Sequence, residues 1–207
     1  MDTFRGNTIY LRLMEPQDYE TTYPWRNDYN MQKKTCGPLR FISKEMEKNW
    51  AQNRSMNNTQ DIYLAVCLIE NDKMIGYTSI NDINTVNRSC DIGGIVIGDK
   101  DYRDGNAVVE VYIMLLAYIF DQLNMHRTYA YYLDFHRMSA ACIEATFYQI
   151  EGCKRQAIYK DGNYHDMICA GLLREEYYEH RNNGEYEFSV TLKRLVKLLK
   201  KKKKKNE

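Results

Sequence analysis

The segment Ile95-Val96-Ile97-Gly98-Asp99-Lys100-Asp101-Tyr102-Arg103-Asp104-Gly105-Asn106-Ala107 decides the fold. It predicts a strand, a short turn and the start of a long helix that runs from Val108 to about Gln122. The first N–H groups of a helix have no partner within the helix, and the helix dipole is positive there, so this junction favours an anion. An ordinary strand-to-helix turn is the alternative interpretation.

Two side chains of this turn favour a phosphate-bearing ligand. Arg103 can add charge-assisted hydrogen bonds, and Gly105 can let a pyrophosphate approach the main chain closely. The turn has no Lys-Ser/Thr pair and no Gly-x-Gly-x-x-Gly pattern. The sequence therefore excludes a P-loop and a dinucleotide-binding fingerprint.

Length and composition predict one main domain with a large sheet. The chain has 207 residues, of which 44% are hydrophobic and 28% are charged, which is enough to bury a sizeable core. Tyrosine is unusually frequent, with 18 copies, and several fall in strand-like runs such as 129–132. Aromatic side chains suit a pleated, half-buried surface, so these runs favour strands.

The cysteines and the N-terminus predict a cytoplasmic protein. The six cysteines are scattered without a Cys-x-x-Cys pair or a histidine at zinc-ligand spacing, so we expect neither a metal site nor a disulfide framework. The start of the chain lacks a signal-peptide pattern, and no apolar run is long enough for a transmembrane segment. A reducing compartment fits these features best.

Charge is distributed unevenly along the chain. Residues 193–207 hold nine of the 29 basic residues and one of the 28 acidic ones, so residues 1–192 carry a net charge of −7. Six consecutive lysines, Lys200 to Lys205, repel one another and predict a disordered segment. We therefore divide the chain into a domain at residues 1–180 and a basic C-terminal tail at residues 181–207. We expect residues 193–207 to be a solvated segment that is dispensable for folding. The alternative is that the apolar residues between Phe188 and Leu199 form a short amphipathic segment that docks on the acidic body or on an anionic surface.

The remaining pattern predicts alternating strands and helices. Strands are expected at 8–13, 62–70, 74–83, 90–97, 128–133, 150–159 and 165–172, and helices after Glu15-Pro16, from Ser43, and at about 138–146. Gly93-Gly94 indicates a bulge or splay within its strand, and Asp161-Gly162-Asn163 a hairpin turn. The order predicts an α+β (mixed α/β) fold with a mostly antiparallel twisted sheet of about seven strands flanked by helices.

This arrangement resembles the GNAT superfamily of acetyl-CoA-dependent N-acetyltransferases. Within it, the chain is most similar to the branch of ribosomal-protein N-terminal and spermidine acetyltransferases. The segments that carry the resemblance are Tyr10-Leu11-Arg12, Trp25-Arg26-Asn27-Asp28, Lys73-Met74-Ile75-Gly76-Tyr77, Asp101-Tyr102-Arg103, Leu123-Asn124-Met125-His126-Arg127, Glu151-Gly152 and Asp161-Gly162-Asn163-Tyr164-His165-Asp166.

The resemblance implies a set of site residues. The expected contacts to acetyl-CoA are Ile95, Val96, Ile97, Arg103, Asp104, Gly105, Asn106, Ala107, Val108, His136 and Ser139, and those to the acceptor are Trp25 and Asn27. Asp91 is the candidate general base. The family's pyrophosphate loop reads Arg/Gln-x-x-Gly-x-Gly/Ala, and no register of this chain satisfies it fully.

Two positions in the following helix also depart from the family. An Asn that contacts the pantetheine arm and a Tyr that protonates the leaving thiolate correspond to His136 and Ile143. Isoleucine cannot donate a proton, so the chain either uses another acid, such as a neighbouring tyrosine, or has lost efficient turnover. The sequence predicts direct acetyl transfer to a primary amine, such as a polyamine, a peptide N-terminus or an amino sugar. The alternative is a degenerate GNAT protein that binds CoA or a partner without efficient catalysis. A homo-oligomer is possible on either interpretation.

Overall fold

The computed structural model describes residues 4–56 and 58–204. Its strands form one eight-stranded, mostly antiparallel sheet in the order β1-β2-β3-β4-β6-β8-β7, with the short β5 paired to β3. The expected α+β class is confirmed, with one strand more than anticipated. The strands are β1 (Ile9–Leu13), β2 (Ile62–Leu68), β3 (Met74–Asn84), β4 (Ser89–Ile92), β5 (Val96–Ile97), β6 (Arg127–Leu133), β7 (Gln149–Lys160) and β8 (Asn163–Leu173).

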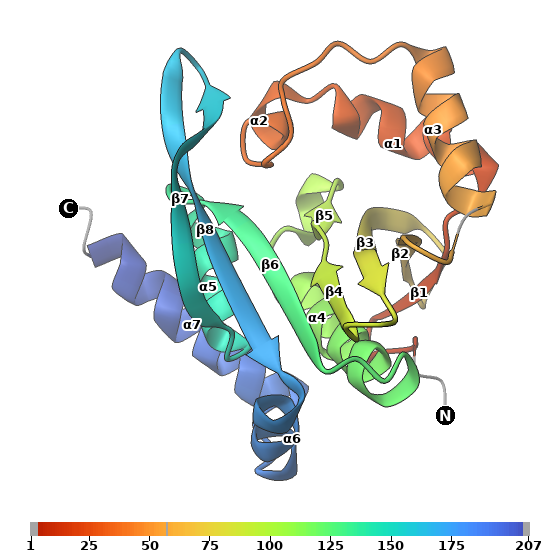
Figure 1. Ribbon diagram of the computed structural model, residues 1–207. Coiled ribbons are helices and arrows are strands. Elements are labelled where there is room, and N and C mark those ends of the chain that lie inside the picture. The colour runs from red at the N-terminus through yellow and green to blue at the C-terminus, as the bar shows by residue number, and fades with distance from the viewer. Residues whose placement is uncertain (1–3, 57, 205–207) are drawn as a thin grey trace.

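Helices flank this sheet, as Figure 1 shows. They are α1 (Tyr19–Arg26), α2 (Tyr29–Gln32), α3 (Lys44–Met56), α4 (Asn106–Ala117), α5 (Arg137–Ala145), α6 (Arg174–Asn182) and α7 (Phe188–Lys204), with short 3-10 turns at Pro16–Asp18 and Lys100–Tyr102 and a π-helical turn at Tyr118–Gln122. Ser43 caps α3 as expected, because its Oγ accepts a hydrogen bond of 3.1 Å from the Met46 N–H. Helices α2 and α6 were not predicted as separate elements, and α7 was considered only as a short amphipathic segment that was the alternative to a solvated tail.

The sheet has a separate apolar cluster on each face. The large core contains Val111, Leu115 and Phe120 of the α4 region, Ile143 of α5 and Leu195 of α7. A smaller cluster joins Ala51 of α3 to Ala65, Cys67 and Met74 of the neighbouring strands, together with Met14. Both faces are therefore covered by helices, and α4, α5 and α7 share the larger core.

The sheet opens at a glycine pair. Strand β4 pairs with β6 in parallel only as far as the partners Asp91 and Tyr129. The chain then diverges through Gly93 and Gly94, and β5 pairs with β3 instead, with Val96 opposite Tyr77. The single expected strand at 90–97 is thus two strands, and the splay expected at Gly93-Gly94 lies between them (Figure 1).

The C-terminal region differs from its expected disorder. Residues 188–204 form α7, which packs against α4 and α5, so the lysine run is helical as far as Lys204, and Lys205 lies outside the described residues. Leu195 is 1% exposed and belongs to the large core. An amphipathic helix is stabilised mainly by burying its apolar face, which outweighs repulsion between lysines on the exposed face. The domain division at residue 180 stays a prediction.

Candidate active site

A cleft of about 790 Å³ lies at the point where β4 and β6 separate. Its walls come from the α1–α3 region, from β3 to β5, from the start of α4, and from β6 and α5. Many of the expected site residues line it: Trp25, Asp91, Ile95, Val96, Ile97, Arg103, Gly105, Val108, His136 and Ser139. The topology therefore gathers side chains from distant segments of the chain.

Strand β5 presents one backbone edge to this cleft. Among the described strands, β5 pairs only with β3, through Val96 with Tyr77 and Ile97 with Gly76. A Cβ on Gly76 would lie 2.3 Å from the Val96 carbonyl oxygen, so only glycine allows this close pairing. The opposite edge of β5 faces the space that β6 has left, and an extended ligand can pair with such an edge.

The turn before α4 is shaped by its own polar contacts. Arg103 donates from Nε to the Ile97 carbonyl (2.9 Å) and from a terminal nitrogen to the Gly98 carbonyl (2.6 Å), which ties the turn to β5. Gly105 caps α4 with a φ of +97°, a conformation that favours glycine. The Asp104 carboxylate accepts a hydrogen bond of 2.9 Å from the Asn106 N–H. One helix-end N–H is therefore already paired with an anionic side chain.

Asp91 belongs to a polar group on β3 and β4. It stands opposite Asn81 in the antiparallel register, and both side chains line the cleft together with Ser79. Burial raises the pKa of Asp91 to about 6, while the hydrogen bond from Asn81 acts in the opposite direction. The Oδ1 of Asn81 is buried without a hydrogen-bond partner among the described residues. The polar group therefore combines the Asp91 carboxyl, whose pKa is close to neutral pH, with the Asn81 Oδ1, which has no hydrogen-bond partner among the described residues.

Gly93 makes room for that polar group. A Cβ at this position would lie 2.1 Å from the Ser79 Oγ and 2.5 Å from the Asn81 Nδ2. A side chain would therefore displace two of the polar groups beside Asp91. The sequence singled out Gly93 but did not indicate Ser79 or Asn81, because neither lies near Asp91 along the chain.

The start of α5 contributes an uncharged histidine. His136 precedes the first residue of α5, and its Nδ1 lies 2.5 Å from the Ser139 Oγ. Burial, and then the charge of Lys34, lower the pKa of His136 to about 4, so the ring is neutral at pH 7. Two turns after His136, Ile143 is 2% exposed and lines the cleft without any polar atom on its side chain.

Several tyrosines surround the cleft, and sequence reasoning named them only as a group. Tyr112 of α4 and Tyr131 and Tyr132 of β6 line it, and burial raises the pKa of each hydroxyl. Tyr131 remains 40% exposed and is the most exposed residue of these three. Each of these phenols is protonated near neutral pH and can donate a proton.

Trp25 connects the α1 side of the cleft to the turn. A Cβ on Gly98 would lie 1.9 Å from the Trp25 ring, so the indole packs directly on the main chain that follows β5. The neighbouring Trp50 packs edge-on against Tyr63 and Tyr77, with ring centroids 5.5 and 5.9 Å away. This wall of the cleft is therefore largely aromatic.

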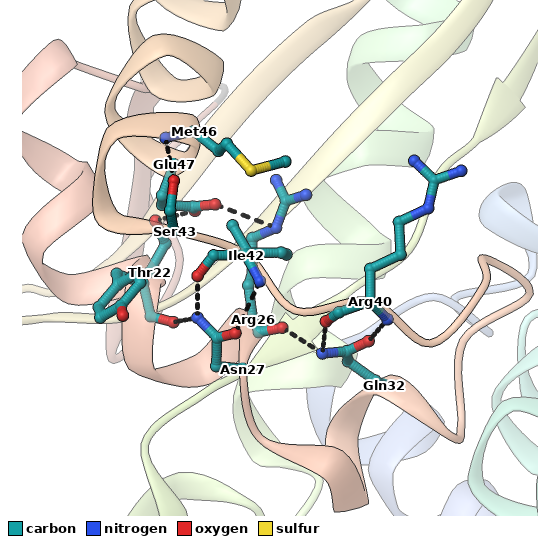
Figure 2. A network of polar contacts seen from close by, with 10 residues as sticks. Thr22, Arg26, Asn27, Gln32, Arg40, Ile42, Ser43, Met46 and Glu47 are labelled. Carbon is teal, nitrogen blue, oxygen red and sulfur yellow. Dashed lines mark hydrogen bonds and ion pairs between the residues drawn. The ribbon is translucent and has the colours of Figure 1, made fainter.

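Asn27 lies outside the cleft lining and holds a loop in place (Figure 2). Its Nδ2 donates to the Tyr23 and Ile42 carbonyls, and its Oδ1 accepts from the Ile42 N–H, at 3.0–3.1 Å. Gln32 similarly binds the main chain of Arg26 and Arg40. Both amides thus fix the loop between α2 and α3, and both Nδ2 hydrogens of Asn27 are used in these contacts.

A buried charge network supports this loop from behind. Glu47 of α3 is fully buried, accepts a hydrogen bond of 2.6 Å from the Thr22 hydroxyl, and lies 3.3 Å from the Nε of Arg26 (Figure 2). The Arg26 guanidinium carbon lies 4.0 Å from the Trp50 ring centroid. At the other end of the loop, Lys160 of β7 is 1% exposed and donates to the Gln32 and Gly37 carbonyls.

Three further predicted site residues lie beside the cleft without lining it: Asp104, Asn106 and Ala107. Ala107 is buried, and the other two bind one another. None of the helices in residues 4–56 and 58–204 has the length and apolar content needed to cross a bilayer. The same residues bring together no group of three or more His, Cys, Asp or Glu side chains suited to a metal ion.

The chain is similar to known acetyltransferases. It is 24% identical over 110 residues to the putative ribosomal N-acetyltransferase YdaF of Bacillus subtilis, a match that covers 53% of this chain and 59% of that protein's length. Spermidine N-acetyltransferase from Vibrio cholerae, solved with CoA and spermine, has the same fold, with a TM-score of 0.75 and 19% identity over 82% of this chain and 98% of that one.

A GNAT-family acetyltransferase from Bacillus anthracis likewise gives a TM-score of 0.72 with 19% identity, over 84% of this chain and 99% of that one. These structural likenesses extend over strands and helices on both sides of the splay. Residues 8–146 match the model of the acetyltransferase (GNAT) domain, and the chain belongs to this family.

Proposed function

We propose that this protein is an acetyl-CoA-dependent N-acetyltransferase that transfers an acetyl group to a primary amine by direct attack in a ternary complex. The observation that carries the proposal is the splay between β4 and β6, which exposes one edge of β5 and the Asp91 carboxyl to the same cleft. Membership of the GNAT family and the fold shared with amine acetyltransferases support it.

The residues of the cleft fit a thioester cosubstrate. The edge of β5 can pair with the amide groups of the thioester arm, and the left-handed Gly105 leaves the main chain of the turn open to phosphate oxygens. Arg103 holds this turn through the Ile97 and Gly98 carbonyls. The pairing of Asp104 with the Asn106 N–H must loosen if a pyrophosphate is to use that donor.

In the proposed reaction, Asp91 receives a proton from the attacking amine. A bound acetyl-CoA supplies the activated acetyl group, and the amine nitrogen forms a bond to its carbonyl carbon as the carbon–sulfur bond breaks. A carboxyl with a pKa of about 6 is ionised at pH 7 and remains a useful base. Asn81 orients Asp91, and its unpaired Oδ1 can accept a hydrogen bond from the amine.

A tyrosine of β6 replaces the acid that Ile143 cannot provide. Tyr131 lines the cleft, is 40% exposed, and has a pKa raised by burial. Its protonated hydroxyl can therefore donate a proton to the thiolate leaving group. His136 is neutral, and its contact with Ser139 positions the ring beside the same wall. These roles use residues that the topology places around one cavity.

The acceptor is proposed to be a cationic amine that enters along the aromatic wall. Trp25 and Trp50 line the cleft and can contact an aliphatic or cationic chain, and residues 1–192 carry a net charge of −7. The similarity to a putative ribosomal N-acetyltransferase and to a spermidine N-acetyltransferase supports polyamines and peptide N-termini.

The test combines calorimetric titration of the protein with acetyl-CoA and a thiol-release assay. Acceptors in the assay are spermidine, an amino sugar and a peptide with a free N-terminus, and the matched control is the same peptide with a blocked N-terminus. We expect saturable acetyl-CoA binding and thiol release only with free amines. Binding without release from any amine would favour a degenerate member, an alternative that Ile143 and the Asp104 pairing support. Failure to bind acetyl-CoA would contradict the proposed function and leave only a degenerate member that binds a partner.

A further inference from the structure

A second cavity lies between the start of α5 and the end of α7. Its volume is about 450 Å³, and it is lined by Arg137, Met138, Leu199 and Lys200. Met138 also lines the large cleft. The two cavities therefore meet at one side chain, and a ligand longer than the cleft can pass over Met138 into the smaller one.

The direction of α7 explains why its lysines reach this position. Arg194, near the beginning of α7, donates to the Ala145 carbonyl at the last residue of α5, at 2.8 Å. Leu199 and Lys200 meet Arg137 and Met138 at the opposite end of α5. The two helices are thus antiparallel, and Lys200 of α7 lies beside Met138, a residue that also lines the cleft.

Helix α7 also contacts the turn before α4. The Leu195 Cδ2 lies 3.4 Å from the position that a Cβ on Gly105 would occupy. Leu195 is 1% exposed, so this contact is part of the packed core and does not depend on a surface side chain. Because Leu199 lies one helical turn further on, the same helix face touches the turn before α4 and lines the smaller cavity.

The charges of the smaller cavity favour an anion. Arg137 and Lys200 make no ion pair with any carboxylate of the described residues, and Lys197 and Lys201 are exposed on the same helix. Elsewhere the chain is acidic, with a net charge of −7 over residues 1–192. A phosphate that leaves the cleft on this side therefore meets a local positive potential on an otherwise negative molecule.

We propose that the cavity between α5 and α7 binds the 3′-phosphate at the nucleotide end of CoA, with Arg137 and Lys200 as its cationic contacts. The proposal rests on the proposed function, because the thioester arm is taken to lie along β5. It makes α7 a part of the cofactor site. An unrelated polyanion such as nucleic acid is the competing occupant of the same charges.

The test compares CoA with 3′-dephospho-CoA in calorimetric titrations of the full chain, at low and at physiological salt. Wild-type protein is expected to bind CoA about fivefold to tenfold more tightly, with the preference shrinking as salt rises. Lys200→Ala and Arg137→Ala should each weaken CoA binding about fivefold and leave the affinity for 3′-dephospho-CoA unchanged. Lys193→Ala, two turns earlier on α7, is the matched control and should change neither affinity.

Other outcomes contradict the inference in distinguishable ways. Equal affinity of the wild type for both compounds, or equal weakening of both by Lys200→Ala, would overturn the 3′-phosphate assignment and leave the proposed function standing. Retention of a short DNA duplex that is lost in Lys200→Ala, with the CoA preference unchanged, would assign the lysines to nucleic acid instead. If the wild type bound neither compound, the proposed function itself would fail.

Discussion

Asn81 of β3 and Asp91 of β4 stand opposite one another in the antiparallel register, and the Asn81 amide opposes the rise in the pKa of Asp91 that burial causes. The pairing of β4 with β6 ends at Asp91, so the same residue marks the last closed rung of the sheet and the first polar group of the cleft. The position of the candidate base is therefore set by the point at which two strands separate.

Asp91→Asn should lower turnover far more than it lowers acetyl-CoA affinity. The substitution keeps the shape of the side chain but removes the proton acceptor, for which a loss of about 100-fold or more in kcat is expected. In the wild type, kcat/KM should rise as pH increases through about 6, because Asp91 must be ionised, and the variant should lose this limb. A pH–rate profile that Asp91→Asn left unchanged would remove Asp91 from the mechanism.

The Asp91 carboxyl should also make the stability of the protein depend on pH. Its contribution to stability should fall as pH rises, whereas turnover should rise. Because the folded-state pKa of Asp91 is raised to about 6, the folded protein holds this proton where the unfolded chain, with a pKa near 3.9, has released it. The contribution of Asp91 to the free energy of unfolding therefore falls between about pH 4 and pH 6. Urea denaturation across this range should show a flatter pH dependence for Asp91→Asn than for the wild type.

Glu47→Gln should destabilise the protein by about 1–3 kcal/mol, because it leaves the Arg26 guanidinium without its buried charge partner. Burial raises the pKa of Glu47, an effect that the Thr22 hydroxyl and then Arg26 oppose. Glu45→Gln, an exposed carboxylate on the same helix, is the control and should change stability by less than about 0.5 kcal/mol. Equal denaturation midpoints of the two variants would show that the network contributes little.

Gly105→Ala should destabilise the turn before α4 by about 1–2 kcal/mol, since its φ of +97° is unfavourable for any residue with a Cβ. The Leu195 Cδ2 at 3.4 Å leaves room for a methyl group, so the cost arises mainly from the backbone. Gly152→Ala is the comparison, because its φ is not positive and a Cβ there meets no atom within 4 Å. Thermal unfolding of both variants measures the difference, and similar melting temperatures would contradict it.

Leu195→Ala should reduce the free energy of unfolding by about 2–5 kcal/mol, as expected for a leucine buried to 1% exposure. Val196→Ala, next to it at 40% exposure, should cost less than about 1 kcal/mol. For the same reason, a chain that ends after Leu192 should melt at a lower temperature than one that ends after Leu199. If both truncated chains melted like the full protein, α7 would be dispensable, as the sequence alone suggested.

Local chemistry made much of the fold predictable. The Asp161-Gly162-Asn163 turn was identifiable because Asp-Gly pairs favour the positive φ that a two-residue hairpin turn requires. In the structure, Asp161 and Gly162 have φ angles of 51° and 82°. The runs at 62–70 and 74–83, joined by the turn-prone residues 71–73, indicated β2 and β3, and Ser43 marked the start of α3. Each of these features depends on residues within about one turn or one hairpin, which a single sequence displays.

The sequence by itself determined the α+β class, the strand-turn-helix at 95–107 and the opening at Gly93-Gly94, because glycine placement and hydrophobic period act locally. Only the tertiary structure decided that Asn81 and Ser79 lie beside Asp91, that Asn27 holds a loop, and that Arg103 binds the carbonyls of Ile97 and Gly98. The tertiary structure also decided that the lysine run begins within a helix. Repulsion between Lys200 to Lys205 predicts disorder, but Leu195 and Leu199 pack against the apolar core to which α4 and α5 contribute. Burial of these leucines depends on helices about 50 or more residues away along the chain, so the local apolar pattern alone could not decide between a packed helix and a solvated tail.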